Sequence, residues 1–208
     1  MKNLILTLII TLPQTLWGQG WEQTYGVTNE DIGHSVQQTS DGGYVLVGMT
    51  FPFVNGPCDI ILLKTDGNGT EQWNKTYGGT SFDRGYSVQQ TTDGGYIIAG
   101  STSSFGNTGG GVYLIKTDVN GNEQWSQIYG DTAHAEHGFS VQQTSDDGYI
   151  IVGYTVGIIG NNVDDVYLVK TDGNGNEQWS QTYGGTERDR AYSVQQTTDG
   201  GFIITGRT

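Results

Sequence analysis

Residues 87–100 read Ser-Val-Gln-Gln-Thr-Thr-Asp-Gly-Gly-Tyr-Ile-Ile-Ala-Gly, and this stretch decides the fold. A polar run comes first, an Asp-Gly-Gly segment follows at residues 93–95, and an apolar run occupies residues 96–100. Asp and Gly tolerate the positive φ angles of tight hairpin turns. The apolar run shows little alternation, which is typical of a strand covered on both faces. The stretch therefore predicts a β-hairpin whose second strand is buried.

This hairpin belongs to an internal repeat. The run Ser-Val-Gln-Gln-Thr occurs unchanged in four places, starting at Ser35, Ser87, Ser140 and Ser193. A tryptophan recurs at spacings of 52, 52 and 54 residues, at Trp21, Trp73, Trp125 and Trp179. The copies differ most in segments 51–56, 103–110 and 156–162, which we therefore expect to be loops. Self-similarity at a fixed period of this length predicts a repeat architecture.

Each unit contains four strand-like runs. Besides the two hairpin runs, there is a Glu-Gln-Trp run in which Trp73, Lys75 and Tyr77 share one face, and an apolar run at residues 112–117. Turns such as 118–121 join the last run to the next tryptophan run, and no helical periodicity follows residue 20. Four short strands per unit predict an all-β protein, a β-propeller with blades of about 52 residues. A β-helix or a β-sandwich array is the alternative.

The repeat count predicts about three and a half blades, which is an incomplete ring. No fourth run follows the last apolar run, so we expect a domain truncated at its C-terminus; a ring completed by a second chain is the alternative. Stacked blades should largely bury Trp73, Trp125 and Trp179. Trp21 should be more exposed, because the strand that would precede it is missing.

The motif Gly78-Gly-Thr-x-x-Asp83, followed by Ser-Val and then by Asp-Gly-Gly-Tyr-Ile-Ile-x-Gly, resembles the β-propeller repeats of secreted bacterial and archaeal surface proteins. The element from Asp118 to Trp125 also resembles the tryptophan-docking element of quinoprotein-type propellers. It departs from that element because its turn is one residue shorter and lacks the leading Ala, so no quinone-binding residue is carried over. The resemblance implies that the Ser-Val-Gln-Gln-Thr strand is innermost and the tryptophan strand outermost.

The N-terminus differs from the rest of the chain. Lys2 is the only charge in residues 1–20, and Leu4 begins an apolar run that ends before Pro13. This pattern predicts a secretory signal peptide, and the run is too short to span a bilayer. A buried first strand or helix is the alternative. We therefore divide the chain into a signal peptide, residues 1–20, and a repeat domain, residues 21–208, that is secreted, extracellular or attached to the cell surface.

The net charge and the cysteine content of the chain indicate which classes of partner and which kind of stabilisation to expect. Nine basic and 22 acidic residues give a net charge of −13, which disfavours nucleic acids and anionic membrane surfaces. A single cysteine, Cys58, excludes a disulfide framework within one chain. We expect no membrane span, an extracellular protein or glycan as partner, and self-association through open blade edges.

Two turns resemble the start of a calcium-binding loop, because Asp118, Asn120 and Asn122 alternate as they do again from Asp172. Glu123 stands where such a loop has glycine, and no distal bidentate glutamate follows. We interpret both segments as hairpin turns stiffened by Asp and Asn side chains, while calcium binding stays open.

Other polar residues give weak signals. A carboxylate recurs once per blade, at Asp31, Asp83, Glu136 and Asp189, and repetition favours a structural role such as capping backbone N–H groups. The histidines are not repeated; His134 and His137 with Glu136 could contact a metal, but they lie in a loop rather than on a helix. Surface ion pairs are the expected role of Arg84, Arg188 and Arg190.

We assign no catalytic, cofactor-binding or metal-binding residue and expect no cofactor. The favoured function is a binding, interaction or display module whose variable loops contact the partner. The alternative is a fragment of a secreted propeller enzyme, for instance a glycan-cleaving one, whose catalytic residues lie in blades outside this sequence.

Overall fold

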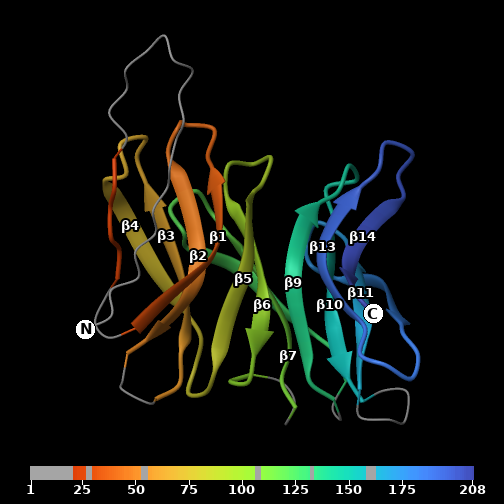
Figure 1. Cartoon of the computed structure of the whole chain (residues 1–208). Helices are drawn as coiled ribbons and strands as arrows, with labels where there is room; N and C mark the ends of the chain where they lie inside the picture. The colour runs from red at the N-terminus through yellow and green to blue at the C-terminus, as the bar shows by residue number, and fades with distance from the viewer. Residues whose placement is uncertain (1–20, 27–29, 53–55, 106–108, 132–133, 158–162) are drawn as a thin grey trace.

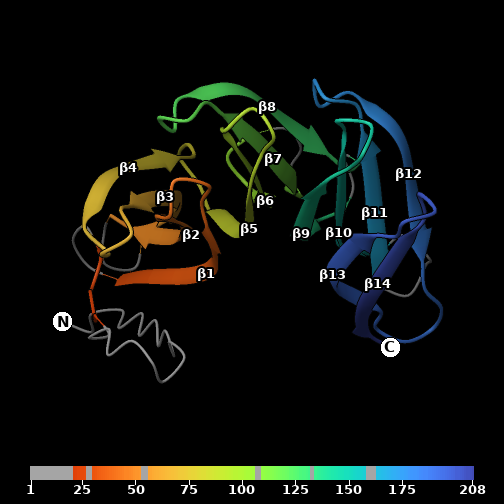
Figure 2. The ribbon, with the colours of Figure 1, turned by 90° about the horizontal axis from the view of Figure 1, so that it is seen from above.

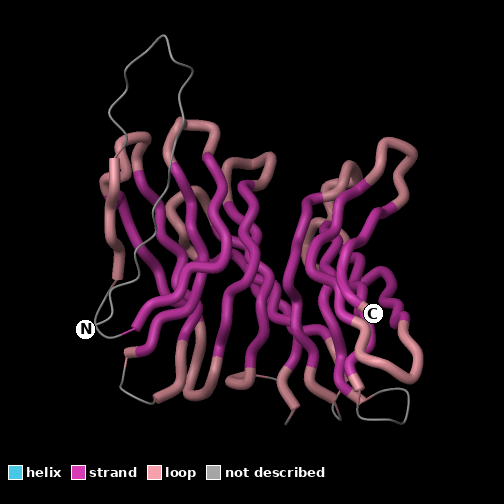
Figure 3. The backbone as a smooth tube through the Cα atoms, viewed as in Figure 1, coloured by secondary structure: helices cyan, strands magenta, loops and turns pink. Residues whose placement is uncertain are grey.

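The structure is a computed structural model that describes residues 21–26, 30–52, 56–105, 109–131, 134–157 and 163–208. Within these ranges the chain forms strands and loops without any helix, as Figure 3 shows. The all-β prediction is confirmed. The proposed signal peptide lies outside the described residues, as do parts of the three variable loops, residues 53–55, 106–108 and 158–162.

The described strands form four antiparallel sheets, each a meander in chain order. The first sheet contains β1 (Glu30–Gln38), β2 (Tyr44–Phe51), β3 (Asp59–Thr65) and β4 (Glu71–Tyr77). The second contains β5 (Asp83–Gln90), β6 (Tyr96–Thr102), β7 (Gly111–Thr117) and β8 (Glu123–Tyr129). The third contains β9 (Glu136–Gln143), β10 (Tyr149–Val156), β11 (Asp164–Thr171) and β12 (Glu177–Tyr183). The fourth contains β13 (Arg190–Gln196) and β14 (Phe202–Arg207).

The sheets stand side by side around an arc. In the view of Figure 2, β1, β5, β9 and β13 lie toward the middle of the arc and β4, β8 and β12 lie on its outer side. Figure 1 shows the same sheets from the side, with the first and fourth sheets at opposite ends. The Ser-Val-Gln-Gln-Thr runs therefore form the inner strands and the tryptophan runs the outer strands. Among the described residues, no helix is long and apolar enough to cross a membrane.

The core consists of apolar layers between neighbouring sheets. Val47 and Leu62 of the first sheet pack against Tyr96, Ile98 and Ile115 of the second. The opposite face of the second sheet, including Ile97 and Leu114, packs against the third. Every residue of β6 is buried, as expected for a strand covered on both faces.

Each outer strand also fastens its sheet to the next one. Trp73 makes an edge contact with Tyr96 at 5.8 Å between ring centroids, and the Tyr77 hydroxyl donates to the carbonyl oxygen of Gly121 at 2.6 Å. Gly121 has a φ of 74°, and a Cβ there would lie 2.7 Å from the indole of Trp73. The glycine of this turn is therefore required twice, by its own backbone conformation and by the neighbouring tryptophan.

The prediction that Trp21 is the exposed tryptophan is wrong. Trp21 contacts Tyr44 at 5.8 Å, and the Tyr25 hydroxyl donates to Gly69 at 2.6 Å, so this segment docks on the first sheet as an outer strand docks on the next sheet. Trp73 and Trp125 are half-buried rather than largely buried. Trp179 is the most exposed of the four described tryptophans, at 37 %, because the sheet beside it has only two described strands.

A buried lysine ties the turns of each four-stranded sheet together. The ammonium of Lys116 donates to Asp93 Oδ2 at 2.8 Å, to the carbonyl oxygen of Thr117 at 2.9 Å and to Gln124 Oε1 at 3.1 Å. The equivalent bonds occur at Lys64 and Lys170. The repeated Lys-Thr-Asp, Asp-Gly-Gly and Glu-Gln-Trp motifs are therefore parts of one polar network, since a buried ammonium must be hydrogen-bonded.

Candidate functional site on the inner strands

The inner strands share a β-bulge. Their register shifts lie between Gly33 and Ser35, between Gly85 and Ser87, and at the same positions of β9 and β13. A bulge leaves one residue unpaired and re-aims its side chain. The four bulged residues are His34, Tyr86, Phe139 and Tyr192. All four are aromatic, although the repeat does not conserve their identity.

These rings form a continuous row across the four sheets, which we call the aromatic row. The ring centroids are 5.1 Å apart for His34 and Tyr86, 4.7 Å for Tyr86 and Phe139, and 5.6 Å for Phe139 and Tyr192. The two central rings are half-buried, His34 is exposed, and Tyr192 is 44 % exposed. The tilted, edge-on arrangement is the one that aromatic quadrupoles favour.

Basic side chains lie beside the aromatic row. Arg84, His137 and Arg190 each follow the repeated carboxylate of their sheet. Burial lowers the pKa of His137 to about 4, with further contributions from the nearby charges of Arg84 and Arg190, so its imidazole is neutral at pH 7. The His137 ring lies 4.7 Å from that of Tyr154, and the guanidinium carbon of Arg190 lies 4.2 Å from the same ring.

The two arginines differ in their partners. Arg190 Nε donates to Asp164 Oδ2 at 2.6 Å, so its charge is balanced. Arg84 has a cation–π contact with Phe82, with Cζ 5.0 Å from the ring centroid, and no ion pair among the described residues. The expected surface ion pair is therefore found for Arg190 and not for Arg84. Arg84 retains guanidinium donors that can bind a carboxylate in bidentate geometry.

The repeated Ser-Val-Gln-Gln motif holds the inner strands in register between sheets. Backbone N–H groups of one sheet donate to side chains of the preceding sheet: Gln90 to Gln37 Oε1 at 2.6 Å, and Val141 to Ser87 Oγ at 3.2 Å. Gln90 Oε1 in turn accepts from the N–H of Ser40 at 2.8 Å. Equivalent bonds recur at the next junctions, which explains why these residues are unchanged. The aromatic row thus rests on a cross-linked scaffold.

The repeated carboxylates lie at the junctions between sheets. Asp83 is fully buried and accepts hydrogen bonds from the N–H of Gly79 at 2.9 Å and from the hydroxyls of Thr102 and Ser104. Asp189 accepts from the N–H of Gly185 at 3.1 Å. The bonds from the N–H groups of Gly79 and Gly185 are the predicted backbone caps, found at two of the four repeated carboxylates.

A second set of carboxylates was missed. Asp59 lies beside Asp83, and burial and that neighbour raise its pKa. Asp165 is fully buried, and neither of its carboxylate oxygens has a hydrogen-bond partner among the described residues. Its pKa is raised, mainly by burial and to a smaller extent by the negative charges of Asp189 and Asp164. The equivalent residue of the second sheet is Gly111, so the repeat offered no signal for this position.

The proposed calcium-like turns use their oxygens internally. Asp118 Oδ1 accepts from the N–H groups of Asn120 and Asn122, both at 2.8 Å, and Oδ2 accepts from the Asn122 side-chain amide at 2.9 Å. Asp172 has the same contacts with its own asparagines. These bonds support the interpretation as stiffened hairpin turns.

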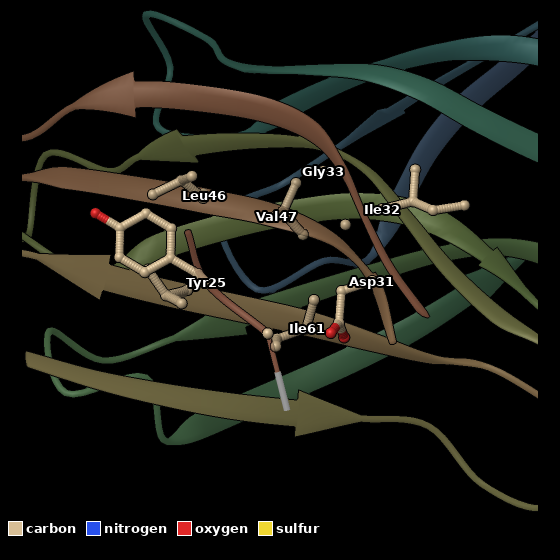
Figure 4. Close-up of a pocket in the computed structure, with 10 residues that line it drawn as sticks. Tyr25, Asp31, Ile32, Gly33, Leu46, Val47 and Ile61 are labelled. Carbon is tan, nitrogen blue, oxygen red and sulfur yellow. The ribbon is translucent and has the colours of Figure 1, made fainter. Parts of the chain in front are cut away.

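An apolar pocket lies on the first sheet, beside the segment that carries Tyr25. Figure 4 shows Tyr25, Leu46 and Ile61 around it, with Asp31 near its rim. Leu46 and Ile61 correspond to Ile98 and Tyr113, which the preceding sheet covers in the second sheet. The pocket therefore lies on the face of the first sheet that corresponds to the face of the second sheet packed against its neighbour.

Comparison with known proteins adds no family: no family model matches this chain, and neither does any curated protein.

Proposed function

We propose that this chain is a secreted or cell-surface β-propeller that acts as a binding or display module, with its sheets as about three and a half blades. The support is the radial order of four-stranded antiparallel sheets and the tight docking of each outer strand on the next sheet. Propellers place their variable residues on a rigid repeated scaffold, and the aromatic row is variable in this sense.

The aromatic row is the observation that carries the proposal. Four bulges direct four rings of three residue types to one continuous surface, and the guanidinium of Arg84, which has no ion pair among the described residues, lies beside the same strands. A purely structural bulge needs no aromatic side chain, and an exposed Tyr192 contributes little to a core. Rigid aromatic rings with an adjacent arginine are the usual anchors of a binding surface.

The ligand that fits is an extracellular glycan that carries a carboxylate. The exposed ring of Tyr192 offers a stacking surface for a sugar ring, and Arg84 offers a bidentate partner for the carboxylate. His137 is neutral at pH 7, so it adds no charge to this surface.

Isothermal titration calorimetry with tetragalacturonate tests this proposal, and cellotetraose serves as the uncharged comparison. We expect saturable binding of the acidic sugar and at least tenfold weaker binding by Arg84→Ala and by Tyr192→Ala. Tyr183→Ala is the matched control, since Tyr183 is a 57 % exposed tyrosine on the outer strand β12. Absence of saturable binding, or equal loss in all three variants, would contradict the proposed site.

The alternative of a glycan-cleaving enzyme has no specific support. Glycoside hydrolysis needs two carboxyl groups that face the sugar. The carboxylate pairs Asp59 with Asp83 and Asp165 with Asp189 lie at sheet junctions, where Asp83 and Asp165 are fully buried.

A further inference from the structure

Three side chains come together where the loop after β8 meets the first residue of β9; Glu136 occupies the repeat position of Asp83, whereas Asp131 and His134 belong to the loop. Asp131, His134 and Glu136 each place one potential ligand atom within 4.8 Å of the other two. His137, which the sequence grouped with His134, points instead to Phe139 and Tyr154. The structure thus groups His134 with two carboxylates, Asp131 and Glu136, rather than with His137.

Glu136 carries the independent evidence. Its side chain is 1 % exposed, and Oε1 accepts from the Thr155 hydroxyl at 3.1 Å. Oε2 is buried and accepts no well-aligned hydrogen bond from the described residues, although the backbone N–H of Asp131 is directed toward this carboxylate. A Cβ on Gly130 would lie 2.1 Å from Oε2, so this oxygen faces the segment that carries Asp131. A buried carboxylate oxygen without a well-aligned partner is costly, and a bound cation would supply the partner.

The other two members are oriented and accessible. His134 Nδ1 lies 2.7 Å from Asp131 Oδ2, and the backbone N–H of His134 donates to Asp131 Oδ1 at 2.9 Å. The side chain of His134 is partly exposed and that of Asp131 is exposed, so an ion from solvent can reach the cluster. The site therefore combines one buried carboxylate, that of Glu136, with two ligands that solvent can reach, those of Asp131 and His134.

We propose that Asp131, His134 and Glu136 bind a divalent transition-metal ion, with Zn²⁺ as the best fit. One imidazole and two carboxylates without a thiolate match the ligands that zinc accepts, and three protein ligands leave the fourth tetrahedral position to water. Calcium fits poorly, because it takes six to eight oxygen ligands and the cluster contains a nitrogen ligand. The ion would join the start of β9 to the loop before it, at the junction of the second and third sheets.

The test is calorimetric titration of the full chain with ZnCl₂, combined with thermal unfolding. We expect one saturable site and a rise in melting temperature of about 5 °C or more at 100 times the dissociation constant, reversed by EDTA. CaCl₂ at the same concentration should leave the melting temperature unchanged. Imidazole signals of His134 should shift on zinc addition in NMR spectra, which reports binding independently of stability.

Two variants and a control locate the site. His134→Ala changes a partly exposed loop residue, and Glu136→Asp introduces the residue that the second sheet has at the equivalent position, Asp83. Both should unfold near the wild-type temperature in EDTA, and both should bind zinc at least 30-fold more weakly. His34→Ala removes an exposed imidazole outside the cluster and should bind zinc as wild type does. Absence of saturable zinc binding, or unchanged binding by His134→Ala, would overturn the proposal.

Discussion

The second and third sheets share strand order, turn motifs and the buried Lys–Asp network, yet they differ where their inner strands begin. At Asp83 every carboxylate oxygen has a hydrogen-bond donor, including the hydroxyls of Thr102 and Ser104. At Glu136, Oε1 accepts from Thr155, and Oε2 accepts no well-aligned hydrogen bond from the described residues. The same repeat position is thus a completed cap in one sheet and an incomplete polar site in the next.

The difference arises from the residue facing each position. Asp59 stands beside Asp83, whereas the residue equivalent to Asp59 in the second sheet is Gly111. A glycine leaves room, and Glu136 has one methylene more than the aspartate it replaces. Two departures from the other copies of the repeat therefore occur together at this junction: glycine stands at the position of Asp59, and glutamate stands at the position of Asp83.

The largest expected effect separates the two carboxylates directly. Asp83→Asn should lower the free energy of unfolding by about 3 kcal/mol, because an amide nitrogen then faces buried donors. Glu136→Gln in EDTA at pH 8 should change it by less than about 1 kcal/mol, since one oxygen has no well-aligned donor to lose. Urea unfolding of both variants measures the difference. Equal destabilisation would show that the two positions are equivalent after all.

A hydroxyl deletion at each junction should give a smaller contrast. Thr102 Oγ1 donates to Asp83 and accepts from the N–H groups of Ser104 and Phe105 at 3.1 and 3.3 Å. Thr155 Oγ1 donates to Glu136. We expect Thr102→Val to cost about 2 kcal/mol and Thr155→Val about 1 kcal/mol in chemical unfolding. The reverse order would contradict the assignment of the second sheet as the completed cap.

The smallest difference between the second and third sheets is expected for the Lys–Asp network, whose aspartates should have similar pKa values in both sheets. Burial acts to raise the pKa of Asp93, but hydrogen bonds from Lys116, Thr91 and Gly95 outweigh it and hold the pKa at about 2. For Asp146, hydrogen bonds from Thr144 and Lys170 are the leading causes, and its pKa is also about 2.

A lowered carboxyl pKa stabilises the folded state above the unfolded value, near 3.8, and that stability is lost as pH falls through about 2. The melting temperature should therefore fall between pH 4 and pH 2. Asp93→Asn and Asp146→Asn should each weaken this dependence by a similar amount, because both carboxylates are half exposed and paired with an equivalent lysine. A strong effect in one sheet alone would indicate that the networks are not equivalent.

The tryptophans of the outer strands provide a further comparison, between Trp73 in the first sheet and Trp179 in the third sheet. Trp73→Ala should cost about 3 kcal/mol, whereas Trp179→Ala should cost less than about 1 kcal/mol, because Trp179 is the more exposed and packs beside a two-stranded sheet. Chemical unfolding of the two variants measures both values. This prediction also tests whether the fourth sheet covers its neighbour in solution as little as it does in the structure.

The sequence by itself determined the sheets. A period near 52 residues, four runs per period and glycine-rich turns specify four-stranded antiparallel meanders, because strand pairing within a hairpin is local. It also located the turn glycines and the capping role of Asp83 and Asp189. A residue that recurs at the same position of every repeat indicates that the backbone there has the same conformational or hydrogen-bonding requirement each time. Such positions can be identified from the residue spacing alone.

Only the tertiary structure decided how neighbouring sheets meet, and the candidate sites lie there. The contact of Trp21 with Gly69, the bonds between Gln37 and Gln90 and the aromatic row join residues of adjacent repeats. The bulge that turns Tyr86 toward Phe139 leaves no mark in the alternation of polar and apolar residues. The meeting of Glu136 with His134 rather than of His134 with His137 depends on where a loop returns to a junction. Such proximity is set by side-chain packing between elements, so residue spacing along one strand does not reveal it.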